Sequence, residues 1–138
     1  MATHRIHLKG PWDVTGPWQD VTETGEIRSV AMPQRWESLF GSNSGTATFS
    51  RWFHQPTNLV AEDRLAIVLT GVTGAGRAWL NDQLLGEFVA KKEAIRLSMT
   101  LSQLQQRNRL RIELSCSVGE GPGGLYDAVA MEIESDGA

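Results

Sequence analysis

Two pairs of carboxylates are the first residues in this sequence whose spacing suggests catalysis. Glu62 and Asp63 are adjacent, and Glu132 and Glu134 alternate along a predicted strand. Hydrolysis of a glycosidic bond needs two carboxylates held about 5 Å or about 6.5–9.5 Å apart across a bound sugar. Period-two spacing instead places Glu132 and Glu134 on one face of a strand. We expect both pairs to be outward-facing, solvated carboxylates.

Other catalytic and metal-binding motifs are absent from the sequence. It contains no Gly-x-Ser-x-Gly elbow, no P-loop, no Gly-x-Gly-x-x-Gly after a strand and no Cys/His ligand spacing. His4 and His7 are expected to be exposed strand residues. The single cysteine, Cys116, lies in an apolar strand, where a free thiol usually behaves as a small hydrophobe. The sequence therefore predicts no cofactor and no metal-binding residues.

The five tryptophans are the residues best suited to binding chemistry. An indole face stacks on the apolar face of a sugar ring, and tryptophan also dominates protein interfaces. Strand alternation puts Phe49 and Phe53 on one face and Trp52 and His54 on the opposite face. If the phenylalanines lie in the core, the Trp52 ring must lie on the outer face of the sheet. Trp18, which follows a proline in a loop, is the second candidate for an exposed ring.

The elements that must position these side chains are mainly strands. The most informative stretch is 64–88, which reads as three consecutive strands. Asn81 and Asp82 both tolerate positive φ and predict a tight two-residue hairpin between the second and third of these strands. Ser102 is a candidate N-cap for a short helical turn. Further strands are predicted over 5–9, 27–31, 46–55, 95–99, 110–114 and 129–133, and short helical turns within 32–45 and 101–107.

Length and composition predict one ordinary globular domain, residues 1–138. Apolar residues make up 41% of the chain and charged residues 21%, and the 14 glycines favour turn-rich β structure. The formal net charge of −3 gives no electrostatic case for nucleic acid as a partner. No signal peptide and no membrane-spanning run is present, so the chain as given is expected to be cytoplasmic, with no membrane partner.

Five motifs follow one another along the chain: LKGPW at 8–12, MPQRW at 32–36, GTATFSRWFHQP at 45–56, a glycine-rich hairpin at 64–88 and NRLRIEL at 108–114. This ordered set resembles the sugar-binding domain of glycoside hydrolase family 2 enzymes, such as β-galactosidases and β-glucuronidases, and the resemblance spans roughly the whole chain. It implies an all-β fold, a jelly-roll β-sandwich of the galactose-binding-domain-like type with one or two short helical turns. It also implies that the chain is not an enzyme, since the catalytic residues of that family lie in a separate barrel domain.

The resemblance also bears on individual residues. Trp12, Trp36 and Trp79 stand at positions where they are expected to fill the core or seal its ends, although Trp36 is kept as a candidate for sugar contact. Asn43 lies in a loop that in the family points towards a sugar subsite, and its amide offers hydrogen bonds to a hydroxyl. Galactose-binding-type folds often hold a structural calcium ion, but no oxygen-ligand cluster with EF-hand-like spacing supports one here.

Two functions remain open from the sequence. In the first, the chain is a non-catalytic carbohydrate-binding or accessory domain, and its partner is a carbohydrate or a catalytic glycosidase domain. In the second, it is a protein-interaction module without sugar affinity, in which the outer face around Trp52 docks a partner or a second copy to form a homodimer. The candidate carbohydrate-binding residues are Trp52, His54, Asn43, Trp18 and Trp36.

Overall fold

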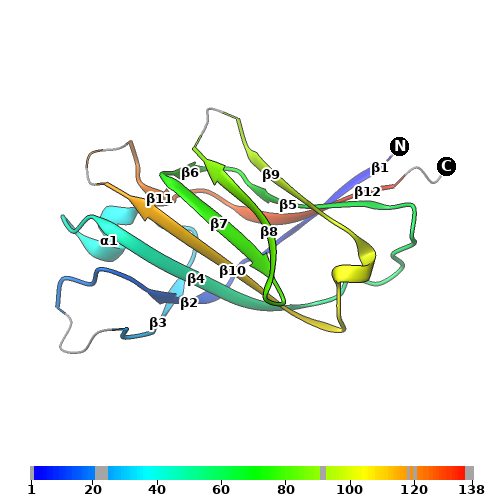
Figure 1. Ribbon diagram of the computed structural model, residues 1–138, viewed down its shortest axis with the longest axis horizontal. Helices are drawn as coiled ribbons and strands as arrows, with labels where there is room; N and C mark the ends of the chain where they lie inside the picture. Colours follow the sequence, from blue (N-terminus) through cyan, green and yellow to red (C-terminus); the bar gives the residue numbers. More distant parts are fainter. Residues whose placement is uncertain (1, 21–24, 91–92, 118, 120, 136–138) are drawn as a thin grey trace.

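The chain folds almost entirely into β-strands (Figure 1). The structure is a computed structural model and describes residues 2–20, 25–90, 93–117, 119 and 121–135. The elements are, in chain order, β1 (Ala2–His7), β2 (Pro11–Thr15), β3 (Arg28–Ala31), α1 (Trp36–Phe40), β4 (Gly45–His54), β5 (Arg64–Leu69), β6 (Val72–Thr73), β7 (Ala75–Leu80), β8 (Gln83–Val89), β9 (Ile95–Met99), the 3₁₀ turn η1 (Leu101–Gln103), β10 (Arg107–Cys116), β11 (Gly124–Leu125) and β12 (Val129–Ser135).

Two antiparallel sheets form the layers of a sandwich. The four-stranded sheet has the order β1-β12-β5-β9, and the six-stranded sheet has the order β3-β2-β4-β10-β7-β8. A two-stranded β11-β6 ribbon accompanies them. The first and last strands lie side by side in Figure 1, because β1 and β12 are paired from Ala2 and Ser135 to His7 and Ala130. The predicted all-β jelly-roll sandwich with one or two short helical turns is confirmed.

The core lies between the two sheets, where alternation along each strand directs apolar side chains. In the four-stranded sheet Ile67 and Met131 are fully buried, and in the six-stranded sheet Phe49 and Ile112 are fully buried opposite each other on β4 and β10. Each such side chain contributes about 1.5–3 kcal/mol by leaving water. Because the inner positions are fixed by this burial, the residues between them must face outward. In β5 and β12 these alternate residues, Ala66, Val68 and Ala130, are buried as well, whereas those of β10 in the six-stranded sheet are accessible.

The β7–β8 hairpin turns at the predicted pair, with φ of 51° at Asn81 and 66° at Asp82. Positive φ at both central residues gives the turn the twist that antiparallel strands need. The Asn81 side chain also donates to Oδ1 of Asn108 at 2.9 Å and accepts from the Arg109 amide at 2.9 Å. Asn108 is completely buried, and its amide donates in turn to the Gln105 carbonyl. These bonds fix the hairpin to the start of β10.

Both helical turns were predicted, but one cap was assigned to the wrong residue. The turn η1 begins after Thr100, which forms a capping box with Gln103. Ser102, the predicted N-cap, lies inside the turn instead. Thr100 is the first residue whose backbone leaves the sheet, and capping therefore falls to it.

Candidate functional site

The outer face of the six-stranded sheet brings two tryptophans to either side of a row of arginines. Arg107, Arg109 and Arg111 point outward from β10 because Asn108, Leu110 and Ile112 between them are buried. Strand register places β10 between β4 and β7. Trp52 of β4 is opposite Arg109, and Trp79 of β7 is opposite Arg111. We call this set the Arg–Trp surface, and it comprises Trp52, His54, Trp79, Arg107, Arg109 and Arg111.

Two of the three guanidinium groups lie on indole rings. The Arg107 Cζ atom is 4.3 Å from the centroid of the Trp52 ring, and the Arg111 Cζ atom is 4.5 Å from the centroid of the Trp79 ring. Arg109 lies between these two stacks, with its Nη2 atom 3.5 Å from the Ser50 hydroxyl oxygen. A cation over an indole face contributes about 0.5–1 kcal/mol at an exposed site. The stacks therefore hold both guanidinium groups in defined positions without neutralising their charge.

Within the described part of the chain, neither Arg107, Arg109 nor Arg111 forms an ion pair with a carboxylate. The next arginine on the same outer face, Arg77, does have a partner, since its Nε atom is 3.3 Å from Glu87. Because the whole sequence carries a net charge of −3, three unpaired arginines in one row form a local positive region on an otherwise mildly acidic molecule.

Two of the predicted site residues contribute to the Arg–Trp surface. Trp52 is 48% exposed on the outer face, as strand alternation predicted. His54 is also exposed, and β4–β10 register places it opposite Arg107. The Trp52 ring is nevertheless not a bare stacking platform, because a guanidinium already lies over its face. What the two rings and the arginines offer together is a row of oriented N–H donors.

The other three predicted site residues lie elsewhere, at the end of the sandwich near α1. Trp18 and Trp36 are both buried, and each packs against Phe40, with ring centroids 4.8 Å and 4.6 Å apart respectively. The expectation of an exposed Trp18 ring is therefore wrong. Its indole N–H donates to the Glu26 carbonyl, and Arg28 covers the ring at 4.3 Å. The partners Glu26, Arg28 and Phe40 follow Trp18 in other segments of the chain, and the Gly-Pro signal before Trp18 does not reveal that they fold back over its ring.

Asn43 is engaged with its own chain. Its side-chain amide donates to the Pro17 carbonyl at 2.9 Å, and its backbone carbonyl accepts from the Trp36 indole at 2.7 Å. The amide that was predicted to bind a sugar hydroxyl thus closes the loop before β4 onto the loop after β2. Asn43, Trp18 and Trp36 are held by these contacts in a structural cluster that is separate from the Arg–Trp surface.

Trp79 is the clearest site residue that sequence reasoning assigned wrongly. It was expected to fill the core or seal its end, but Ala78 and Leu80 are the buried residues of β7 and Trp79 lies half-buried on the outer face. The arginines of β10 were missed as well. Their signal was present in the sequence, because they alternate with buried residues in RNRLRIEL, but nothing local indicates that they lie between two tryptophans of other strands.

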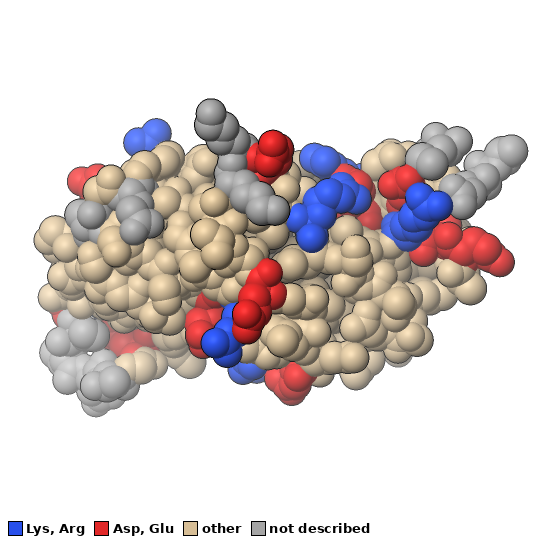
Figure 2. All heavy atoms as spheres, turned by 45° about the horizontal axis from the view of Figure 1, so that its top comes forward, with Lys and Arg blue, Asp and Glu red and all other residues tan. Residues whose placement is uncertain are grey.

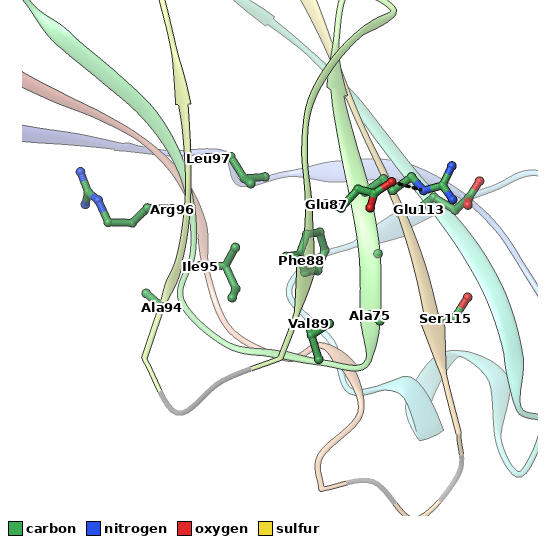
Figure 3. A pocket seen from close by; sticks show the side chains of 12 residues that line it. Ala75, Glu87, Phe88, Val89, Ala94, Ile95, Arg96, Leu97, Glu113 and Ser115 are labelled. Atoms are coloured by element: carbon green, nitrogen blue, oxygen red, sulfur yellow. Dashed lines mark ion pairs between the residues drawn. The ribbon is translucent and has the colours of Figure 1, made fainter.

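A second candidate region is a groove of about 800 Å³ where the edges of the two sheets meet at β8 and β9. Figure 3 shows Phe88 of β8 and Ile95 and Leu97 of β9 directed into the space between these edges. Glu87 pairs with Arg77 at its rim, along the dashed line of Figure 3.

On the side of the molecule drawn in Figure 2, basic residues mostly neighbour acidic ones, so the described charges there are largely balanced.

Glu132 was predicted to be a solvated carboxylate, and this is wrong. It does face outward from the four-stranded sheet, but its side chain is only 5% exposed because two arginines close over it. Oε2 lies 2.7 Å from the Arg5 Nε atom, and Oε1 lies 2.5 Å from the Arg96 Nη1 atom. The hydrogen bond from Arg96, aided by the one from Arg5, lowers the pKa of Glu132 despite its burial. Glu134 is paired more loosely, 3.6 Å from Arg64.

We expect Glu132→Gln to destabilise the fold by about 1–2 kcal/mol at pH 7. The cost is moderate because both arginines are nearly half exposed and regain water when the charge is removed. Since the folded-state pKa lies below the unfolded value of about 4.3, the stabilisation is present above that value and is lost as pH falls through the folded pKa. Urea titrations should therefore show a smaller difference in the free energy of unfolding between wild type and variant at pH 3 than at pH 7.

Glu87→Gln is the matched control for this prediction, because Glu87 and Arg77 form an exposed pair on the other sheet. Exposed pairs contribute about 0–1 kcal/mol, so this variant should differ little from wild type at either pH. A Glu132→Gln penalty that stays the same from pH 7 to pH 3 would contradict the assignment of the effect to the ionised carboxylate.

No group of three or more His, Cys, Asp or Glu side chains among the described residues is arranged to hold a metal ion. No helix in the described ranges has the length and apolar character needed to cross a membrane.

Comparison with known proteins shows what the fold is similar to. No family model matches the chain, and no curated protein matches it by sequence. Among solved structures, a putative β-galactosidase from Bacteroides fragilis has a TM-score of 0.76 at 16% identity, and the alignment covers 96% of this chain and 23% of that one. Bifidobacterium dentium β-glucuronidase in complex with coumarin-3-O-glucuronide has a TM-score of 0.73 at 19% identity, covering 95% and 30%.

A third structure extends the comparison to another uronide. The GH2 β-galacturonidase of Eisenbergiella tayi bound to galacturonate has a TM-score of 0.69 at 15% identity, covering 94% of this chain and 24% of that one. At these identities the likeness shows a shared fold, the one that the motif resemblance implied. The chain spans between about a quarter and a third of the length of these three structures.

Proposed function

We propose that this chain is a non-catalytic carbohydrate-binding accessory domain that works beside a glycosidase catalytic domain. The observation that carries the proposal is the difference between the share of this chain and the share of each similar enzyme that the structural alignment covers. Nearly the whole chain superimposes on glycoside hydrolases, but it corresponds to only 22–32% of the length of three of them. A polypeptide of this extent matches one β-sandwich within a larger enzyme, and the remainder of each enzyme has no counterpart in it.

The carboxylates of the chain support the non-catalytic part of the proposal. A glycosidase needs one carboxyl group that protonates the leaving group and a second that acts as base or nucleophile. Glu132 is enclosed by two arginines that keep it ionised, and Glu87 and Glu134 are each paired with an arginine. A carboxylate held as Glu132 is makes a poor proton donor, because its pKa lies below the range that general acid catalysis requires.

The Arg–Trp surface supports the binding part. It is solvent-accessible, it lies on the broad outer face of a sheet, and it combines indole rings with a row of hydrogen-bond donors. Sugars are recognised by this combination, because hydroxyl and carboxylate oxygens accept from guanidinium groups while C–H-rich ring faces pack on aromatic ones. His54 adds one further polar group at the edge of the surface.

The test is a calorimetric titration of the 138-residue chain with galacto-, glucurono- and galacturono-oligosaccharides. We expect saturable binding to at least one of them, and we expect Trp52→Ala to weaken that binding at least tenfold. The same variant should change the free energy of unfolding by about 1 kcal/mol or less, because the ring is half exposed and contributes mainly its contact with Arg107.

A second function has its own observation. β8 is an edge strand of the six-stranded sheet, and it exposes Leu84 by 49% and Val89 by 67%. An uncovered edge with apolar side chains is a surface on which another strand can pair. If sedimentation detects a concentration-dependent dimer while no oligosaccharide binds in the titration, the protein-interaction function replaces carbohydrate binding.

A further inference from the structure

We propose that the Arg–Trp surface is specific for acidic glycans, and that carboxylate groups along the bound chain pair with Arg107, Arg109 and Arg111. This inference rests on the proposed carbohydrate-binding function and narrows it to one class of ligand. It is carried by the arrangement of the arginines on β10, by the way two of them are stacked, and by the absence of ion-pair partners for them among the described residues.

The spacing of the arginines matches an extended ligand. Alternate residues of a strand are about 7 Å apart, so the three guanidinium groups leave the sheet from points that span about 14 Å along β10. Trp52 and Trp79 lie on the two neighbouring strands opposite Arg109 and Arg111, so they are about 10 Å apart across β10 and about 7 Å apart along it. Arg107 lies over Trp52 on the β4 side and Arg111 lies over Trp79 on the β7 side, so the donors form a track that crosses β10 diagonally, with an indole ring at each end. A linear chain of sugar rings has the shape to lie along it.

Stacking determines which part of each guanidinium is free. When the planar group lies on an indole face, its N–H bonds point outward in the plane, where a carboxylate can accept two of them at once. The same stacking covers part of the indole surface that a neutral sugar would use. The surface therefore offers more to a carboxylate than to the apolar face of a ring, and acidic sugars gain more from it than neutral sugars.

The surrounding charges favour a glycan over a nucleic acid. On the same outer face Glu113 ends the row on β10, while Asp13 of β2 lies on its β4 side and Glu87 of β8 lies on its β7 side. A nucleic acid needs a longer basic path for its phosphates and open aromatic faces for its bases. Here the cationic region is confined to three arginines, and the ring faces already carry guanidinium groups.

The experiment compares an acidic glycan with its neutral ester, with a neutral glycan and with a single-stranded nucleic acid. Oligogalacturonate of defined length is titrated into the whole chain by calorimetry, alongside the same oligosaccharide with its carboxyl groups methyl-esterified, a neutral galacto-oligosaccharide and an oligothymidylate. We expect the free acid to bind at least tenfold more tightly than its ester, because the ester loses the charge that the arginines recognise. Added salt should weaken binding of the acid and leave that of the ester nearly unchanged.

Variants locate the binding to the track. Arg109→Gln and Arg107→Gln should each weaken oligogalacturonate binding about tenfold. Arg109→Lys should restore only part of the affinity, since an ammonium keeps the charge but not the two parallel donors. Arg77→Gln is the matched control, because Arg77 lies on the same face but is paired with Glu87. This control should bind like wild type, and circular dichroism should show all four variants folded.

Each contrary outcome has a separate meaning. Equal affinity for the acid and its ester overturns the acidic specificity and leaves the proposed carbohydrate-binding function standing. No binding of any glycan overturns both. Tighter binding of the oligothymidylate than of oligogalacturonate assigns the surface to nucleic acid instead. A loss of affinity in Arg77→Gln as large as that in Arg109→Gln shows that attraction is spread over the whole face, and it overturns the assignment to the Arg–Trp surface.

Discussion

Gly74→Ala is expected to destabilise the fold by about 3–5 kcal/mol. Gly74 links β6 to β7 with φ of 108°, a conformation that an L-residue adopts only with strain. A Cβ atom at this position would also lie 2.2 Å from the Ser115 carbonyl oxygen of β10, and a backbone atom inside a sheet cannot move aside easily. Both costs act together, and a urea titration monitored by tryptophan fluorescence should show a large fall in the midpoint.

Two other glycines separate the two costs. Gly10 has φ of 88°, and a Cβ atom there would meet nothing within 4 Å beyond its chain neighbours, so Gly10→Ala should cost only about 1–2 kcal/mol for the backbone. Gly76 lacks a positive φ, but a Cβ atom there would lie 2.1 Å from the Glu113 carbonyl oxygen, so Gly76→Ala isolates the clash. If Gly74→Ala lowers the free energy of unfolding no more than Gly10→Ala does, the predicted clash with the Ser115 carbonyl of β10 does not contribute, and the prediction is wrong.

Strand alternation and turn chemistry were enough to predict most of the strands and the β7–β8 hairpin, whereas the jelly-roll sandwich was implied by the family resemblance. The hairpin at Asn81 and Asp82 could be predicted because both residues tolerate positive φ, and that property belongs to the residues themselves. The outward position of Trp52 could be predicted because two phenylalanines on the same strand define the inner face. These inferences need only the near neighbours in the chain, and they succeed for that reason.

Inference failed where the environment of a side chain is supplied by distant segments. The alternation of side chains along the strand placed Glu132 on the outer face correctly. Its burial comes from Arg5 and Arg96, which lie on two other strands. Trp79 was expected in the core because of its position in the family resemblance, although its own strand places Ala78 in the core. Alternation tells which side a residue faces, whereas what covers that side depends on the order of the strands.

The candidate site shows the same division. Trp52 and His54 were found from one strand, but the surface they belong to is made by the register of three strands, β4, β10 and β7. Two of the arginines of β10 are positioned by stacking on indole rings of the neighbouring strands. These residues come together only when the sheet forms. A binding surface on a sheet is thus harder to predict from sequence than a single strand. Its residues come from several strands, and the pairing of those strands is not visible in the sequence.

Trp36→Ala is expected to cost about 3–5 kcal/mol, the usual penalty for removing a buried aromatic side chain. Trp36 is 2% exposed, packs on Phe40, and donates its indole N–H to the Asn43 carbonyl. Its backbone N–H also bonds to the Gly123 carbonyl, so it joins α1 to the segment before β11. Loss of the ring would leave a cavity at the end of the sandwich and release the loop that carries Asn43. A urea titration of the variant beside wild type measures this cost.

Trp36→Phe divides this penalty into its parts, because it keeps an aromatic ring and removes only the donor to Asn43. We expect it to cost about 1–2 kcal/mol, since one half-buried carbonyl loses its partner and the smaller ring fills less space. Glycan affinity should be unchanged in this variant, whereas Trp52→Ala should lose affinity and keep its stability. A Trp36→Phe protein that is fully folded yet binds oligosaccharide tenfold more weakly would place Trp36 in the binding site. Loss of stability alone in Trp36→Phe and loss of affinity alone in Trp52→Ala would instead assign Trp36 to the core and Trp52 to the ligand. This difference follows from the surroundings of each ring, since Trp36 is enclosed by Phe40 and its neighbours and Trp52 lies on the outer face of the sheet.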